Sequence, residues 1–162
     1  MKIKSLMTMT LAAVAFVFSM SSCSSNDDEP EVALATQVEG SYTGNEIFVV
    51  DNEESSNETK AYVFSKVSDT SIDMNIPEVG MGMMTIPSFS VKGITLSKDG
   101  NTIKGKVASY EGTVTGSDGT EKAYTVTDLT ALFSDKTVVV TYTLKYGKMP
   151  FPFTGSFTGT KK

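Results

Sequence analysis

The sequence predicts an all-β fold, specifically an eight-stranded antiparallel up-and-down β-barrel. Two observations carry this prediction. From residue 36 onward, apolar and polar residues alternate with a period of two, and no long stretch shows the helical period of 3.6. Short turns containing glycine and aspartate separate the alternating segments in chain order, which is typical of consecutive hairpins.

The alternation is clearest in the middle of the chain and near its C-terminus. In residues 72–76 the apolar side chains Ile72, Met74 and Ile76 share one face. In residues 138–146 every second residue is a large apolar one, and the residues between them are valine, threonine and lysine. Such segments are half-buried strands with one wet face.

The connections follow from local turn chemistry. Residues 98–101 and 116–119 each contain Asp-Gly and predict hairpin turns. The apolar pattern shifts by one residue at Gly93, which predicts a β-bulge. We expect a long acidic loop at residues 51–59, and one helical turn at residues 127–133 with Asp128 as its cap.

The two ends of the domain predict closure of the sheet. Residues 40–44 (Gly-Ser-Tyr-Thr-Gly) nearly repeat in residues 155–159 (Gly-Ser-Phe-Thr-Gly), which suits first and last strands that lie side by side. An eight-stranded meander that closes on itself has no free edges, and its interior holds side chains or one small ligand.

The N-terminus has the features of a secretory signal. Lys2 and Lys4 precede an apolar run at residues 6–20, which is too short to span a bilayer. Residues 20–23, Met-Ser-Ser-Cys, resemble the lipobox of bacterial lipoproteins. The resemblance implies that residues 1–22 are a removable signal peptide and that Cys23 carries a lipid, which makes the membrane a partner through this anchor.

The segment that follows Cys23 is polar and acidic. Residues 23–35 therefore read as the lipidated cysteine and a flexible tether, and residues 36–162 read as the barrel domain. Acidic residues directly after a lipidated cysteine resemble the surface-export signal of lipoproteins in some Gram-negative gut bacteria. We therefore expect an outer-membrane lipoprotein displayed at the cell surface.

The composition excludes several functions. The formal net charge is −5, and the chain has no Arg, His or Trp, so nucleic acid is not an expected partner. Without histidine, and with Cys23 as the one cysteine, a Ser-His-Asp or Cys-His catalytic site cannot form. No spacing of carboxylates selects an acid–base pair. We expect no enzyme activity, no cofactor and no metal.

The domain also resembles a known family. The lipobox, the acidic tether, the opening Gly-Ser-Tyr-Thr-Gly strand and the closing residues 146–155 look like the calycin-like, or lipocalin-like, β-barrel lipoproteins of gut bacteria. The resemblance implies a barrel, with small-ligand binding or protease inhibition as functions known in the wider group. The lipocalin Gly-x-Trp hallmark is absent, because the chain has no Trp.

The most unusual segment is the methionine-rich stretch at residues 77–87. Since methionine packs against varied ligands, one hypothesis is an apolar lip over the barrel mouth. The candidate ligand-binding residues of this hypothesis lie in the stretch and on both sides of it: Met74, Met81, Met83, Met84 and Phe89. A thioether site for Cu(I) and simple gap-filling in a flexible loop are the alternatives.

Carboxylates offer one further candidate. Asp51, Glu53, Glu54 and Glu58 could gather around Ca²⁺, but their spacing matches no EF-hand loop, and a solvated acidic loop is the favoured interpretation. Two functions stay open at this point. The first is a lipoprotein whose barrel binds a small apolar ligand, and the second is a protein-interaction module, an inhibitor or an assembly subunit, with a solidly packed barrel.

Overall fold

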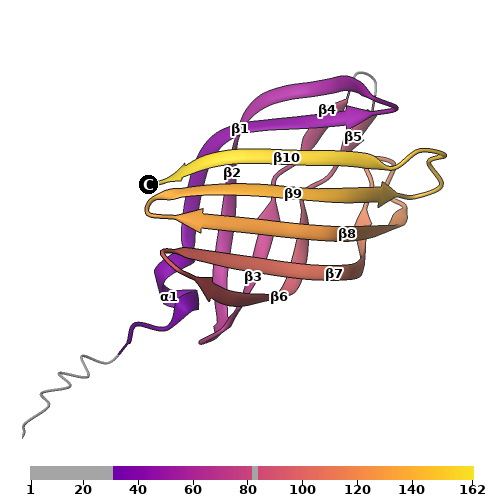
Figure 1. Cartoon of the computed structure of the whole chain (residues 1–162). Coiled ribbons are helices and arrows are strands. Elements are labelled where there is room, and N and C mark those ends of the chain that lie inside the picture. The colour runs from indigo at the N-terminus through magenta and orange to yellow at the C-terminus, as the bar shows by residue number, and fades with distance from the viewer. Residues whose placement is uncertain (1–30, 82–83) are drawn as a thin grey trace, which may run out of the picture. The chain divides into compact units, whose positions relative to one another are not determined.

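The computed structural model describes residues 31–162 except residues 82 and 83. Within it, Val32–Lys162 forms one compact unit built from strands and one short helix (Figure 1). The elements are α1 (Leu34–Val38), β1 (Gly40–Val50), β2 (Glu53–Ser68), β3 (Ser71–Ile76), β4 (Val79–Met81), β5 (Met84–Ile86), β6 (Phe89–Asp99), β7 (Thr102–Thr115), β8 (Glu121–Ser134), β9 (Thr137–Tyr146) and β10 (Phe153–Lys161).

Eight of these strands close into an antiparallel barrel. Their order around the barrel is β1-β10-β9-β8-β7-β6-β3-β2, so barrel strands that are neighbours in the sheet follow one another along the chain, except for β1 and β10 (Figure 1). The predicted eight-stranded up-and-down barrel is confirmed. The short strands β4 and β5 form a separate two-stranded sheet inserted between β3 and β6.

The pairing of β1 with β10 closes the barrel, as the near-repeat at the two ends predicts. Gly44 is the register partner of Gly159, and Phe48 is the partner of Gly155. The two backbones approach so closely that a Cβ added to Gly44 would lie 1.9 Å from the carbonyl oxygen of Thr158. Glycine is required at this position because no side chain fits there.

The alternation of the sequence determines which side chains enter the barrel. On β9 the buried residues are the predicted apolar set, from Val138 to Tyr146 in steps of two. On β10 Phe153, Gly155, Phe157 and Gly159 are buried in the same way. Large and small residues therefore alternate along the interior face of the closing strand.

The predicted bulge and turns are present. Ile72 of β3 pairs with Ile94, whereas Met74 pairs with Val91, so β6 carries one extra residue at Gly93. Gly93 adopts a positive φ of 70°. Gly100 and Gly119 also adopt positive φ at the two Asp-Gly turns, a conformation that glycine tolerates without strain.

The prediction of a long loop at residues 51–59 is wrong. Only Asp51 and Asn52 form the connection, with φ values of 50° and 66°, and β2 begins at Glu53. Two consecutive residues with positive φ make the tight turn whose twist matches that of the flanking strands. The acidic residues therefore extend a strand paired with β1, and the register partners Val50 and Glu53 flank the turn.

The prediction of a helical turn at residues 127–133 is also wrong. These residues belong to β8, which stays paired with β7 and β9 on either side. The register shifts between Thr127 and Thr130, and Asp128 has a φ of 54°. Asp128 thus forms a bulge and not a helix cap, because a short polar side chain tolerates the left-handed conformation.

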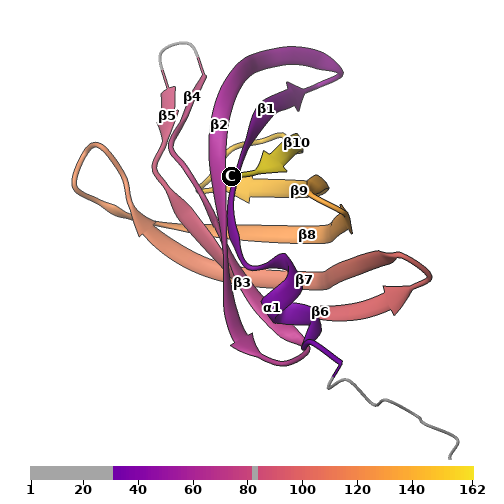
Figure 2. The same cartoon turned by 90° about the vertical axis from the view of Figure 1, so that its left-hand side faces the viewer.

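The helix α1 covers one end of the barrel (Figure 2). Ala35 and Val38 are buried in the core, and the carbonyl oxygen of Val38 accepts a 3.0 Å hydrogen bond from the Tyr42 hydroxyl. Leu34 and Ala35, the last residues of the predicted tether, belong to this helix. No helix in residues 31–81 and 84–162 has the length and apolarity needed to cross a bilayer.

The glycines of the barrel wall make room for rings, and this arrangement can be tested at Gly155. A Cβ at Gly155 would lie 2.4 Å from Cζ of the buried Tyr142. We expect Gly155→Ala to destabilise the fold by about 1–3 kcal/mol, since the ring has no free space to move into. Thermal unfolding followed by circular dichroism measures the effect. Gly80→Ala is the control, because nothing lies within 4 Å of the added methyl group, and it should leave the melting temperature unchanged.

Candidate functional site

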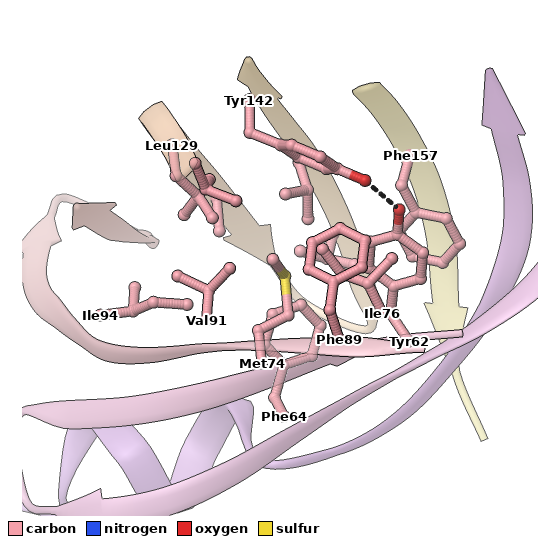
Figure 3. Packing of buried hydrophobic residues seen from close by; sticks show 14 of the residues in the cluster. Tyr62, Phe64, Met74, Ile76, Phe89, Val91, Ile94, Leu129, Tyr142 and Phe157 are labelled. Carbon is pink, nitrogen blue, oxygen red and sulfur yellow. Dashed lines mark hydrogen bonds between the residues drawn. The ribbon is translucent and has the colours of Figure 1, made fainter. Parts of the chain in front are cut away.

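The structure places two of the predicted ligand-binding residues in the core of the barrel. Met74 on β3 is 0% exposed and Phe89 on β6 is 3% exposed, and both point into the interior (Figure 3). Met81 and Met84 belong to β4 and β5, in which Val79 and Ile86 are buried. Met83 and Cys23 lie outside the described residues.

Aromatic rings fill the barrel interior. Near α1, the rings of Tyr42, Phe64 and Phe133 pack edge to face at centroid distances of 5.0–5.8 Å. Further along the barrel, Tyr62 stacks on Phe157 with 4.0 Å between ring centroids. Each of these rings is at most 3% exposed. Almost none of their surface is accessible to a water-sized molecule, either from outside or from an internal void.

One carboxylate lies among these rings. Glu46 of β1 is 0% exposed, and its Oε2 accepts a 2.5 Å hydrogen bond from the Tyr62 hydroxyl. The Tyr62 oxygen lies 3.0 Å from that of Tyr142 (Figure 3). Since the Tyr62 proton is used on Glu46, Tyr142 must donate to Tyr62. The other oxygen of Glu46, Oε1, is buried and has no hydrogen-bond partner.

Burial governs the protonation of this cluster. Desolvation raises the pKa of Glu46 above the usual value, while the Tyr62 hydrogen bond and the charge of Lys60 oppose the rise, and the charge of Glu58 adds to it. Burial also raises the pKa values of Tyr62 and Tyr142, so both phenols keep their protons and act as donors. The raised pKa makes the neutral form of Glu46 more favourable than it is for an exposed glutamate.

The alternation of β1 contained a signal for this cluster that sequence reasoning missed. Tyr42, Gly44, Glu46 and Phe48 occupy every second position, which places Glu46 on the same face as the two aromatic residues. Its neighbours on β2 continue toward the barrel end. Lys60 pairs with Glu58 at 2.5 Å and donates to the carbonyl oxygen of Glu78 at 2.8 Å.

The predicted candidates for Ca²⁺ do not gather into a site. Asp51 lies in the turn before β2, and Glu53, Glu54 and Glu58 are spread along that strand. In the part of the chain that the structure describes, no three His, Cys, Asp or Glu side chains are grouped so that they could hold a metal ion.

The outer surface of the closing strands has uncharged residues at four paired positions on each of four strands, and the exposed Asp128 lies in the β8 bulge between two of them. We call this surface the uncharged face; its strands lie side by side in Figure 1. Its residues are Thr43, Asn45, Ile47 and Val49 on β1, Thr154, Ser156, Thr158 and Thr160 on β10, Thr137, Val139, Thr141 and Thr143 on β9, and Thr127, Thr130, Leu132 and Ser134 on β8. Leu132 and Val139 are register partners, each 40% exposed, among mostly threonine neighbours.

Comparison with known proteins supports the fold. No family model and no curated protein matches the chain. A crystal structure described as that of a "putative outer membrane protein" from Bacteroides fragilis is similar, with a TM-score of 0.62 and 20% sequence identity. The alignment covers 80% of this chain and 53% of that chain, so this chain spans about half the length of the Bacteroides protein.

The buried carboxylate predicts a specific pH dependence of stability. Because the folded-state pKa of Glu46 is raised, its stability contribution is complete below the unfolded value and is lost as pH rises through the folded-state pKa. Glu46→Gln keeps an acceptor for Tyr62 and cannot ionise. We expect this variant to be more stable than the wild type at pH 8, by about 1.4 kcal/mol for each unit by which the pKa is raised.

Urea unfolding of both proteins between pH 4 and pH 8 measures this difference. The stability advantage of Glu46→Gln should grow with pH and level off above the folded-state pKa. Glu58→Gln serves as a control, since the Glu58 side chain is 47% exposed and no comparable pH-dependent gain is expected. A constant difference between Glu46→Gln and the wild type across this range would contradict the proposed protonation of Glu46.

Proposed function

We propose that this chain is an outer-membrane lipoprotein whose calycin-like barrel is an assembly subunit, pairing with a second copy through the uncharged face. In this proposal Cys23 carries the lipid, the acidic segment after it displays the barrel at the cell surface, and the protein has no enzyme activity. The lipobox-like residues 20–23 support the anchor. The similarity to a structure described as an outer membrane protein supports the location.

The observation that carries this proposal is the filled interior. A barrel that stores a ligand keeps accessible surface on the side chains that line its cavity. Met74 and Phe89, the central residues of the ligand-binding hypothesis, retain almost no such surface. Of the two functions that the sequence left open, the geometry therefore favours the protein-interaction module, which uses the outside of the barrel.

Electrostatics favour the uncharged face as the contact surface. The chain has a net charge of −5, so two copies repel each other at most orientations. Contact through the uncharged face covers one ionisable group among these positions, Asp128 in the β8 bulge, which limits the desolvation cost of buried charges. Leu132 and Val139 give this face an apolar centre, and threonine methyl and hydroxyl groups surround it.

The borders of the face are complementary in charge. On the β7 side, Lys104 and Lys106 are the register partners of Leu132 and Thr130. On the β2 side, Glu54 is the register partner of Val49. A two-fold axis parallel to the strands would place the lysine border of one copy against the glutamate border of the other. This isologous arrangement is the commonest symmetry of soluble oligomers.

The face is of moderate size. Its four strands, about 4.8 Å apart, and four outward positions, about 6.8 Å apart, span roughly 500 Å². This is less than the about 800 Å² that a standard interface buries on each partner, so the dimer belongs to the small class of specific interfaces.

Dimerisation can be tested with a charge placed at the centre of the face. We expect the full chain in nonionic detergent to sediment as a dimer at micromolar concentration. Val139→Lys should weaken the dimer by about 100-fold or more, since it places two ammonium groups close to the two-fold axis. Val67→Lys is the matched control, because Val67 is 59% exposed and lies outside the face.

Sedimentation equilibrium gives the dissociation constants of the three proteins. A wild-type monomer at 100 µM would contradict the proposal, as would equal weakening by the two substitutions. A heterologous envelope protein that binds the face while the chain itself stays monomeric would also replace the second copy as the partner.

The membrane anchor has its own test. Cys23→Ser should abolish incorporation of labelled palmitate and release the protein from the membrane fraction, because the acyl chains supply the membrane affinity. Replacing Asp27, Asp28 and Glu29 by Asn, Asn and Gln should keep the lipid and lower the fraction that protease removes from intact cells. Palmitate labelling that persists in Cys23→Ser would exclude this residue as the anchor.

A further inference from the structure

A groove of about 590 Å³ lies at the barrel end away from the β8–β9 turn. One wall is the start of β8, and the other is the chain that leaves β9. Its lining residues are Thr120, Glu121, Lys122, Ala123, Tyr146, Gly147, Lys148 and Met149. The volume falls within the range of about 300–1,000 Å³ that is typical of sites for small molecules.

The groove exists because two neighbouring strands end at different heights. Tyr124 of β8 is the register partner of Tyr146, the last residue of β9, so residues 121–123 of β8 project past the end of β9. At Gly147, with a φ of 56°, the chain turns, and its amide donates to the carbonyl oxygen of Ala123 at 2.8 Å. This hydrogen bond ties the two walls together at the base of the groove.

The lining combines an apolar floor with cationic groups. Ala123, Tyr146 and Met149 supply apolar surface, and Met149 packs against the core. The ammonium group of Lys122 also lines the groove, and it forms an ion pair with Asp118 at 3.0 Å. Lys148 has no carboxylate partner within the described part of the chain, so its charge is available to a ligand. A molecule that fits must offer an apolar body and a negative group.

Two further polar groups belong to the lining residues. The hydroxyl of Tyr146 is buried without a hydrogen-bond partner, so it offers no accessible donor to a ligand in the groove. The carboxylate of Glu121 keeps its negative charge and accepts a 2.8 Å hydrogen bond from the Thr113 hydroxyl on the neighbouring strand β7.

We infer that this groove is a binding site for a small amphipathic carboxylate, held by Lys148 through its charge and by Tyr146 and Met149 through apolar contact. The site lies outside the filled barrel interior. It shares no residue with the uncharged face, so occupancy of the groove does not depend on dimerisation.

The test is a titration of the ¹⁵N-labelled full chain in nonionic detergent with 4-phenylbutyrate, followed by backbone amide shifts. We expect saturable shifts at Ala123, Gly147 and Met149. The neutral probe 4-phenyl-1-butanol has the same apolar body and should bind about tenfold more weakly. Lys148→Gln should weaken 4-phenylbutyrate by a similar factor, which corresponds to about 1.4 kcal/mol.

Lys136→Gln is the control variant, because Lys136 lies in the β8–β9 turn at the other barrel end, and it should bind 4-phenylbutyrate like the wild type. Shifts that are absent from Ala123, Gly147 and Met149, or that do not saturate, would overturn the site. Equal affinity for the acid and the alcohol, or an unchanged affinity in Lys148→Gln, would overturn its anionic specificity. The dispersion of each variant's spectrum reports whether it is folded.

Discussion

The pairing of β1 with β10 is the constraint on which the rest of the structure depends. These strands are the first and last of the domain, and their hydrogen bonds turn an eight-stranded meander into a barrel without free edges. Closure defines an inside, and everything buried there follows from it. Gly44 permits this closure, because its backbone meets that of β10 where no Cβ would fit, and its register partner Gly159 leaves room for the Phe157 ring.

The barrel interior is a packed core and not a ligand cavity. Glycines on the wall lie against large rings, as Gly155 does against Tyr142, so the rings occupy the space that the absent side chains leave. Glu46 is the exception, since a carboxyl group in such surroundings is costly unless it is protonated or paired. The phenols of Tyr62 and Tyr142 partly offset this cost by donating in sequence toward it.

A filled interior moves the question of function to the outer surface. Two features there differ in chemistry: the uncharged face, rich in threonine, and the groove beside Lys148 at one barrel end. Both arise from regular features of the sheet. The face arises from the outward half of the strand alternation, and the groove arises because β8 continues past the end of β9. Neither requires a long loop.

The sequence by itself determined the fold class and most of its details. Strand alternation with a period of two predicted the buried set on β9 and β10, and the Gly-Ser-aromatic-Thr-Gly repeat predicted which strands meet. Local chemistry also predicted the bulge at Gly93. These features depend on neighbours within a few residues, or on one repeated motif, and such information is present in a single chain.

Only the tertiary structure decided what the local patterns leave ambiguous. Acidic residues at 53–58 form a strand because β1 supplies their hydrogen-bond partners, and Asp128 bulges because β7 and β9 hold β8 in register. Met74 is part of the core because closure of the barrel buries it completely, and the same closure places Tyr62 of β2 within hydrogen-bonding distance of Glu46 of β1. Whether a barrel is hollow depends on the summed volumes of residues far apart in the chain, and no local pattern encodes that sum.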